Sequence, residues 1–297
     1  MNGKKTEENQ VDSVILTLGY FDCLHVGHRA LIARAQELAS ACGAEAAVFT
    51  FDRDPASVFR STAGTVLTLD ERIERIRKTG VRKVIVGAGT AEFLSQSPDD
   101  FLHWLDGRCK IVGYVCGKDF RFGKCAVGTA ETLSAYAKET GKTVAVLDDV
   151  TVDGVRVSTS EIRRLLADGK VAEAKRLLVE PYSVRGVVFA DRKVGRSIGF
   201  PTINLKIAPE KAKLKNAVYT GHILIDGIFY RAIVNYGARP TFGLGEMLAE
   251  AHIDGFSGDL YGREVTLYLD DFLRDIVRFD SAAALAAQLK KDIEAIR

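Results

Sequence analysis

Two histidines, His25 and His28, lie in one short segment between an apolar run and a helical pattern. Residues 14–18 are predicted to form a strand and residues 29–41 a helix. A helix that starts directly after a strand is a natural phosphate site, because its free N–H groups and the positive end of its dipole face the connecting turn. Imidazoles three positions apart share one face of the first turn, and Gly27 between them lets a ligand approach the main chain. The pair therefore predicts contacts to an oligophosphate, whereas a lone histidine would more often be a surface or capping residue.

A second segment whose side chains could bind a metal is Pro201-Thr202-Ile203-Asn204. In an extended conformation the side chains of Thr202 and Asn204 point to the same face. Hydroxyl and amide oxygens are hard ligands, which suit a Mg²⁺ ion that bridges ATP phosphates. The preceding segment could fold over a nucleotide with donors from the main chain, and its relevant residues are Gly195, Arg196 and Gly199.

Hydroxyl and basic residues also surround the start of a predicted helix near residue 158. Ser158 and Glu161 have the spacing of a capping box, so the hydroxyl of Ser158 could simply cap this helix. Several neighbours could instead donate to triphosphate oxygens at the helix N-terminus. These neighbours are Arg156, Thr159, Ser160 and Arg163.

Length and composition indicate a globular protein of two domains. The chain has 297 residues, 47% of them hydrophobic and 27% charged, and a net charge of +2. A chain of this length usually forms two domains. The low net charge gives no electrostatic footprint for nucleic acid or an anionic membrane, and no apolar stretch is long enough to span a bilayer. The cysteines form no Cys-x-x-Cys pair or metal-ligand cluster, so we expect reduced thiols in a cytoplasmic protein.

The two halves of the chain have different periodicities. In residues 13–180, short apolar runs alternate with helical patterns, which predicts a doubly wound, Rossmann-like α/β sheet. The runs are residues 14–18, 46–51, 81–86, 111–115 and 143–147. In residues 181–297, strand patterns follow one another, Asp226-Gly227 predicts a hairpin turn, and a helix over residues 281–296 closes the chain. We therefore expect a small antiparallel β-barrel with a terminal helix as the second domain.

Several motifs together resemble the family of bacterial bifunctional riboflavin kinase/FMN adenylyltransferases, or FAD synthetases, from about residue 13 to the C-terminus. The His-x-Gly-His pattern after a strand is also similar to the signature of the nucleotidyltransferase superfamily. The motifs are FDCLHVGH (residues 21–28), GKDFRFG (117–123), VSTSEIR (157–163), GRSIGFPTIN (195–204) and NYGARPT (235–241). The resemblance implies that ATP phosphorylates riboflavin to FMN in the C-terminal domain. It also implies that a second ATP adenylylates FMN to FAD in the N-terminal domain, with release of pyrophosphate.

In the adenylyltransferase half, the resemblance assigns His25 and His28 to the β- and γ-phosphates of ATP and to the departing pyrophosphate. Further contacts to ATP or to the flavin phosphate are implied for Phe21, Asp22, Gly27, Asp119, Arg156, Ser158, Thr159, Ser160 and Arg163. The family has Ser-Ser-Thr at residues 158–160, and the exchange found here keeps the hydroxyls. Two interpretations of residues 117–124 remain open. The loop could form a wall for the flavin with a counter-charge for its phosphate, or Phe120 and Phe122 could anchor it in the core.

In the kinase half, the resemblance assigns Glu250 as the general base for the 5′-hydroxyl of riboflavin. Its segment, residues 250–254, alternates in polarity, which on its own indicates the solvated face of a half-buried strand. Thr202 and Asn204 are implied to hold Mg²⁺. Nucleotide contacts are implied for Gly195, Arg196, Gly199 and Pro201. Loops around riboflavin are expected at residues 235–242 and 254–262.

Three segments depart from the family pattern. Arg53-Asp54 stands where the family usually has Pro-His, Cys23 replaces a glycine, and residues 125–127 replace a more basic stretch. We expect adenylylation to survive, because the histidine turn and the helix start at residue 158 are retained.

Three other functions fit part of the sequence. The first is an enzyme in which only the kinase half works, because Arg53-Asp54 impairs the other half or alters its specificity. The second is a flavin- or nucleotide-binding regulator, which would have no use for a general base. The third is a nucleotidyltransferase acting on another phosphate, which leaves the C-terminal domain unexplained. Riboflavin, FMN and ATP are the expected partners, with neither nucleic acid nor membrane, and weak self-association is left open.

Overall fold

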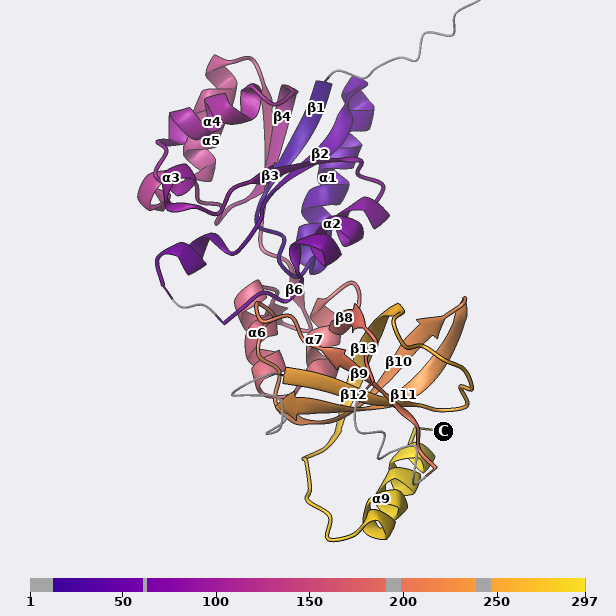
Figure 1. The fold of residues 1–297 in the computed structure, drawn as a ribbon. Coiled ribbons are helices and arrows are strands. Elements are labelled where there is room, and N and C mark those ends of the chain that lie inside the picture. Colours follow the sequence, from indigo (N-terminus) through magenta and orange to yellow (C-terminus); the bar gives the residue numbers. More distant parts are fainter. Residues whose placement is uncertain (1–12, 61–62, 191–198, 239–246, 297) are drawn as a thin grey trace, which may run out of the picture. The chain divides into compact units, whose positions relative to one another are not determined.

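Contacts divide the chain into two units, which Figure 1 shows as a ribbon. The structure is a computed structural model that describes residues 13–60, 63–190, 199–238 and 247–296. The first unit comprises residues 1–62 and 69–157, and the second comprises residues 63–68 and 158–297. Residues 158–177 thus pack with the second unit, although they precede the expected functional boundary near residue 180. That boundary stays a prediction, because packing alone does not say which reaction these residues serve.

The first unit contains a five-stranded parallel sheet in the order β3-β2-β1-β4-β5. This order confirms the predicted doubly wound, Rossmann-like arrangement, in which ligands bind at the carboxyl ends of the strands near the reversal of strand order. The reversal lies at β1, whose carboxyl end leads into the histidine turn. The strands are β1 (Ser13–Leu18), β2 (Glu45–Phe51), β3 (Lys83–Gly87), β4 (Lys110–Gly117) and β5 (Thr143–Leu147).

Helices cover both faces of this sheet. Ile15 and Leu16 alternate along β1 and therefore belong to cores on opposite faces. Helix α1 contributes Ala35 to the core that contains Ile15, and helices α4 and α5 contribute Phe101 and Leu133 to the core that contains Leu16. The α-helices are α1 (Val26–Cys42), α2 (Leu69–Lys78), α3 (Ala91–Leu94), α4 (Pro98–Asp106) and α5 (Ala130–Glu139). The shorter elements are the 3-10 helices η1 (Pro55–Val58) and η2 (Lys124–Ala126) and the hairpin strands β6 (Thr151–Val152) and β7 (Val155–Arg156).

The second unit contains a six-stranded antiparallel sheet in the order β8-β13-β10-β11-β12-β9. A bridge between Phe189 and Asn204 joins its two edges, so the sheet forms the nearly closed barrel that the sequence predicted. Asp226 and Gly227 make the tight turn between β10 and β11, and both have the positive φ that the predicted hairpin requires. The strands are β8 (Ser183–Val187), β9 (Thr202–Lys206), β10 (Ala217–Ile225), β11 (Ile228–Ala238), β12 (Met247–Ile253) and β13 (Glu264–Arg274).

Helices flank the barrel. The terminal helix α9 (Ala282–Glu294) lies within the predicted residues 281–296, begins after the N-cap Ser281 and packs through Ile293 on Val218 and Ile233. Helices α6 (Thr159–Ala167) and α7 (Val171–Leu177) pack on each other, and α7 also contacts β13. Helix α7 and the β6–β7 hairpin were not predicted, because each is too short to show a periodic pattern.

One expected loop is partly wrong. Residues 235–238 continue strand β11, which pairs with β12 as far as Ala238 and Met247. Residues 239–242 of that expected loop lie outside the described residues. The other expected loop, residues 254–262, does connect β12 to β13.

Candidate active sites

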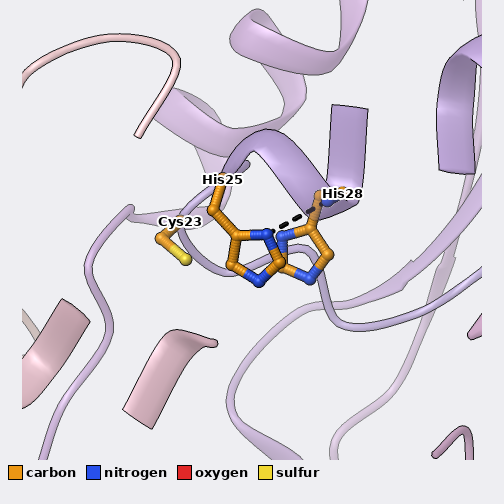
Figure 2. A group of neighbouring side chains, drawn as sticks. All are labelled: Cys23, His25 and His28. Carbon is orange, nitrogen blue, oxygen red and sulfur yellow. Dashed lines mark hydrogen bonds between the residues drawn. The ribbon is translucent and has the colours of Figure 1, made fainter. Parts of the chain in front are cut away.

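The turn between β1 and α1 holds both histidines at the carboxyl edge of the first sheet. His25 is the N-cap of α1, and its Nδ1 accepts a 3.0 Å hydrogen bond from the backbone N–H of His28. Because this lone pair is occupied, the proton of the neutral His25 ring lies on Nε2. The two rings lie face to face, with centroids 3.6 Å apart and planes 8° apart (Figure 2). The cap thus leaves Nε2 of His25 as a hydrogen-bond donor, which is what a contact to phosphate oxygen needs.

The absence of a side chain at Gly27 leaves space for the imidazole of His25. A Cβ at this position would lie 3.1 Å from Cε1 and 3.2 Å from Nδ1 of His25, closer than most real Cβ contacts. The prediction gave ligand approach as the reason for this glycine. In the structure, the neighbour that needs the space is the imidazole of His25.

The residues before the histidines hold the turn in an uncommon backbone conformation. Phe21 and Leu24 have φ values of 56° and 43°, a region that costs a non-glycine residue about 1–3 kcal/mol. Phe21 and Asp22 are fully buried, and the ring of Phe21 lies 4.9 Å from that of His28. Neither side chain is open to a ligand in this conformation, and the contacts predicted for them to ATP or to the flavin phosphate stay predictions.

The electrostatics of the turn keep both imidazoles neutral near physiological pH. Burial lowers the pKa of His25 to about 4, although the Asp119 carboxylate favours the charged ring. Burial also lowers the pKa of His28 well below its usual value, and the charges of His25 and Arg72 act in the same direction. A neutral imidazole still has one N–H that can donate to a phosphate oxygen, and in His25 the cap places this donor on Nε2.

We expect the first unit to lose stability as the pH falls from about 6.5 toward about 4. The folded-state pKa of His25 lies below its unfolded value, so the unfolded chain binds more protons in this range. The loss from His25 between about pH 7 and about pH 5 is about 2 kcal/mol of unfolding free energy, and His28 adds to it. Urea unfolding followed by the fluorescence of Trp104, the one tryptophan, measures this in the first unit.

His25→Asn is the matched variant for this measurement. Asparagine keeps a side-chain oxygen that can cap α1 but does not titrate. The unfolding free energy of the variant should depend less on pH, by about the amount assigned to His25. The same pH dependence in both proteins would contradict the assignment.

Cys23, His25 and His28 also form a cluster of potential metal ligands (Figure 2). Their ligand atoms lie within 4.8 Å of one another. A metal ion binds an imidazole along its lone pair and therefore lies in the plane of the ring. The two rings are stacked nearly parallel, so one ion cannot lie in both planes, and Nδ1 of His25 is engaged by the cap. We therefore assign no metal to this cluster in the observed arrangement.

Arg156 and Asp119 lie in an exposed network of charges. Arg156 donates hydrogen bonds to Asp119 at 2.9 Å and to Asp149 at 3.0 Å, and Lys118 lies 3.4 Å from Asp149. Exposed ion pairs contribute only about 0–1 kcal/mol, so Arg156 could exchange a carboxylate for a phosphate at little cost. The predicted contact of Arg156 to triphosphate would require this exchange.

The residues at the start of α6 belong to the second unit. The hydroxyl of Ser158 accepts a 3.2 Å hydrogen bond from the N–H of Glu161, as the capping-box spacing predicts. Thr159 and Ser160 begin the helix, and Arg163 follows one turn later. A part for these residues in binding ATP stays a prediction.

An aromatic cavity of about 290 Å³ opens in the first unit. Phe122 is buried in the core, and Phe120 stacks on it with ring centroids 5.4 Å apart. Phe122 therefore anchors the loop in the core, as one interpretation predicted, and both rings also line the cavity; a wall for the flavin stays a prediction. The wall also includes the exposed Phe59 and the cationic Arg121. The other aromatic members of the lining are Phe49, Phe51, Phe93 and Phe101.

The structure gives Asp54 a local role at this cavity. Its carboxylate caps η1 by accepting a 2.9 Å hydrogen bond from the N–H of Ala56, and its side chain is buried. Pro55 and Ala56 of η1 line the cavity. Arg53 is exposed and lies beside Asp52. The cavity wall at η1 is thus formed with Asp54 at the position where the family usually has histidine.

The kinase candidates meet where β9 and β12 pair. The hydroxyl of Thr202 donates a 3.0 Å hydrogen bond to Oε1 of Glu250, and Asn204 faces Glu250 in the ladder. Asn204 is 5% exposed, and its Oδ1 is buried with no hydrogen-bond partner among the described residues. An unpaired buried oxygen costs about 1–3 kcal/mol, which a cation ligated there would remove. The predicted extended conformation is confirmed, and the donor set fits Mg²⁺.

The chain before β9 is also fixed to β12. The carbonyl of Pro201 accepts a 2.9 Å hydrogen bond from Nδ1 of His252, a residue that the sequence did not single out. His252 lies two positions after Glu250 and so on the same face of β12, which is the signal that could have found it. Gly199 has φ +86°, a conformation that favours glycine. Gly195 and Arg196 lie outside the described residues.

The two units and their polar clusters are those of a two-domain, nucleotide-dependent transferase. A family model described as FAD synthetase matches residues 7–161, and one described as riboflavin kinase matches residues 178–297. The chain therefore belongs to the family of bifunctional riboflavin kinase/FMN adenylyltransferases.

Relatives with this name align over nearly the whole chain. The bifunctional riboflavin kinase/FMN adenylyltransferase of Listeria monocytogenes is 31% identical, over 94% of this chain and 90% of that protein. Its counterpart in Pseudomonas fluorescens is 33% identical, over 95% and 92%. A crystal structure from Streptococcus pneumoniae, described as a macrolide-efflux protein, has a TM-score of 0.85 and 30% identity, over 95% of this chain and 93% of that one.

Proposed function

We propose that this protein phosphorylates riboflavin to FMN in its barrel unit and adenylylates FMN to FAD in its α/β unit. ATP supplies both groups. The observation that supports this most is the hydrogen bond from Thr202 to Glu250 beside Oδ1 of Asn204, for which the described part of the chain supplies no hydrogen-bond partner. Phosphoryl transfer uses a general base and a metal ion bound to the phosphates, whereas a protein that only binds flavin or nucleotide needs no general base. We also keep the functional boundary near residue 180 as a proposal.

In the kinase site, Glu250 accepts the proton of the riboflavin 5′-hydroxyl as that oxygen attacks the γ-phosphorus of ATP. The bond from the γ-phosphorus to the β–γ bridging oxygen breaks, and ADP leaves. The hydrogen bond from Thr202 holds the carboxylate in place. Thr202 and Asn204 would hold Mg²⁺, which when bound offsets the negative charge of the phosphate oxygens.

In the adenylyltransferase site, a phosphate oxygen of FMN attacks the α-phosphorus of ATP, and pyrophosphate leaves. His25 donates from Nε2 to the β- and γ-phosphates, and the stacked His28 lies beside it. These donors stabilise charge that grows on the leaving group, and no covalent enzyme intermediate is needed. Arg156 and residues 158–163 are proposed to add further donors.

The aromatic cavity is proposed to hold the flavin ring system, with Arg121 near its phosphate. Phe59→Ala tests this well, because Phe59 lines the cavity and is 70% exposed, so its removal should cost little stability. We expect the KM for FMN in adenylylation to rise about tenfold, the loss of about 1.4 kcal/mol of contact to the ring. The KM for riboflavin in the kinase reaction should not change. An unchanged KM for FMN would contradict the placement.

The proposed partners are small molecules: riboflavin, FMN and ATP. In the part of the chain that the structure describes, no helix has the length and apolar character to cross a membrane. None of the five cysteines, all of which the structure describes, forms a disulfide bond, which supports the proposal of a cytoplasmic location. Weak self-association is proposed as well.

The direct experiment is to incubate the protein with FMN and ATP–Mg²⁺ and to quantify FAD and pyrophosphate. We expect the two products in equal amounts. No FAD from FMN, with FMN still formed from riboflavin, would favour the enzyme with only the kinase half active. Binding of flavin without either product would favour the regulator.

A further inference from the structure

Arg72 in helix α2 is a buried charge that the proposed mechanism does not use. Its side chain is 1% exposed, and it is the largest fully buried side chain among the described residues. Removing a guanidinium from water costs several kcal/mol unless hydrogen bonds and charges compensate. The contacts that compensate this cost therefore indicate the role of Arg72.

Those contacts join the ends of two neighbouring strands. Nη1 donates to the carbonyl of Tyr20 at 3.3 Å, and Nη2 donates to the carbonyl of Phe51 at 2.7 Å. The guanidinium also lies over the ring of Tyr20, 4.4 Å from its centroid. Tyr20 opens the histidine turn after β1, and Phe51 ends β2. One side chain thus fixes the carboxyl ends of two adjacent parallel strands.

The two chain segments fixed in this way carry the two halves of the adenylyltransferase site. The segment after Tyr20 leads to His25 and His28, and the segment after Phe51 leads to Asp54 and the cavity-lining helix η1. A shift of either segment would change the distance between the phosphates of ATP and the flavin cavity. Transfer between two bound substrates is sensitive to such a shift, because both must be aligned for attack.

The charge of Arg72 also acts on His28. The titratable and charged groups that influence His28 are His25 in the same turn and Arg72 on α2. Asp22 and Asp54 influence the neighbouring Tyr20, and Asp119 influences His25. Of these groups, Arg72 is the cation supplied from a separate helix.

We propose that Arg72 is a positioning residue for adenylyl transfer, which sets the histidine turn against the cavity segment and acts electrostatically on His28. It touches neither substrate. The activity readout of this inference rests on the proposed adenylylation of FMN, but the titration readout does not.

The variants to compare are Arg72→Met, Arg72→Lys and the control Arg77→Met. Arg77 is exposed on the same helix, so the control removes the same charge without touching the turn. For Arg72→Met we expect adenylylation to fall about 100-fold, with FMN formation by the same molecules unchanged. The His28 ring, followed by NMR through its C–H signals, should titrate at a higher pH than in the wild-type protein. Arg77→Met should change neither.

Arg72→Lys separates the charge from the two hydrogen bonds, since lysine keeps the cation but not the planar fork. We expect the His28 midpoint to stay near its wild-type value while adenylylation falls. If Arg72→Met does not fold, these two results of Arg72→Lys decide the question.

An unchanged His28 midpoint in Arg72→Met, or an equal fall of both reactions, would overturn the inference. So would wild-type adenylylation in Arg72→Lys. If the wild-type protein makes no FAD, the proposed function is contradicted. The effect of Arg72 on the His28 titration can still be measured in that case, so the two failures are distinguishable.

Discussion

Glu250→Gln is expected to abolish FMN formation while the same protein still converts FMN to FAD. Glutamine keeps an oxygen that can accept the hydrogen bond from Thr202, so the pairing of β9 and β12 should survive. It cannot take a proton from the riboflavin hydroxyl, and the loss of a positioned base usually costs about 10²–10⁴-fold in rate. Chromatography of the flavins made from riboflavin, and separately from FMN, measures both reactions.

Glu264→Gln is the matched control for this variant. Glu264 lies on β13 of the same barrel and pairs with Arg185 at 2.6 Å. It is proposed for neither reaction, so both rates should stay within about twofold of wild type. An equal loss of both reactions in Glu250→Gln would instead indicate a general defect. Retained FMN formation in that variant would remove Glu250 from the mechanism.

His25→Asn is expected to have the opposite pattern, with FAD formation lost and FMN formation retained. Asparagine is among the best N-cap residues, so its side-chain oxygen can replace Nδ1 as the acceptor for the N–H of His28. It places no donor where Nε2 lies. Loss of one positioned donor to a developing charge costs about 10²–10³-fold in rate.

His25→Ala completes the comparison, because it removes the donor and the cap together. Its adenylylation should fall as far as that of His25→Asn, and its first unit should also be less stable by about 1 kcal/mol. Rates are measured at saturating FMN and ATP, and stability by the unfolding signal of Trp104. If His25→Asn keeps its adenylylation rate, the imidazole serves only as a cap, and the phosphate assignment is wrong.

Much of the fold could be predicted, because local signals and tertiary structure agree in both units. The apolar runs that form β1, β2 and β4 are strands buried under helices on both faces, so alternation was not required to recognise them. The Asp226-Gly227 turn is specified by backbone sterics that only a few residue types satisfy. The N-cap Ser281 marks the terminal helix for a similar local reason.

The parts of the sites that could not be predicted depend on contacts between distant segments. Nothing in the amphipathic pattern of α2 distinguishes the buried Arg72 from the exposed Arg77. Asp54 is a departure from a family pattern in the sequence, and only the fold shows that it caps η1. The role of Gly27 was predicted from ligand chemistry, but the atom it makes room for belongs to its own neighbour His25.

The central claim is that one chain carries two ATP-dependent sites that act in series. A time course with riboflavin and ATP labelled at either the α- or the γ-phosphate tests it most directly. The γ-label should enter FMN first and then FAD, while the α-label should enter FAD alone. A γ-labelled FMN that accumulates without any α-labelled flavin, or no labelled flavin at all, would contradict the claim.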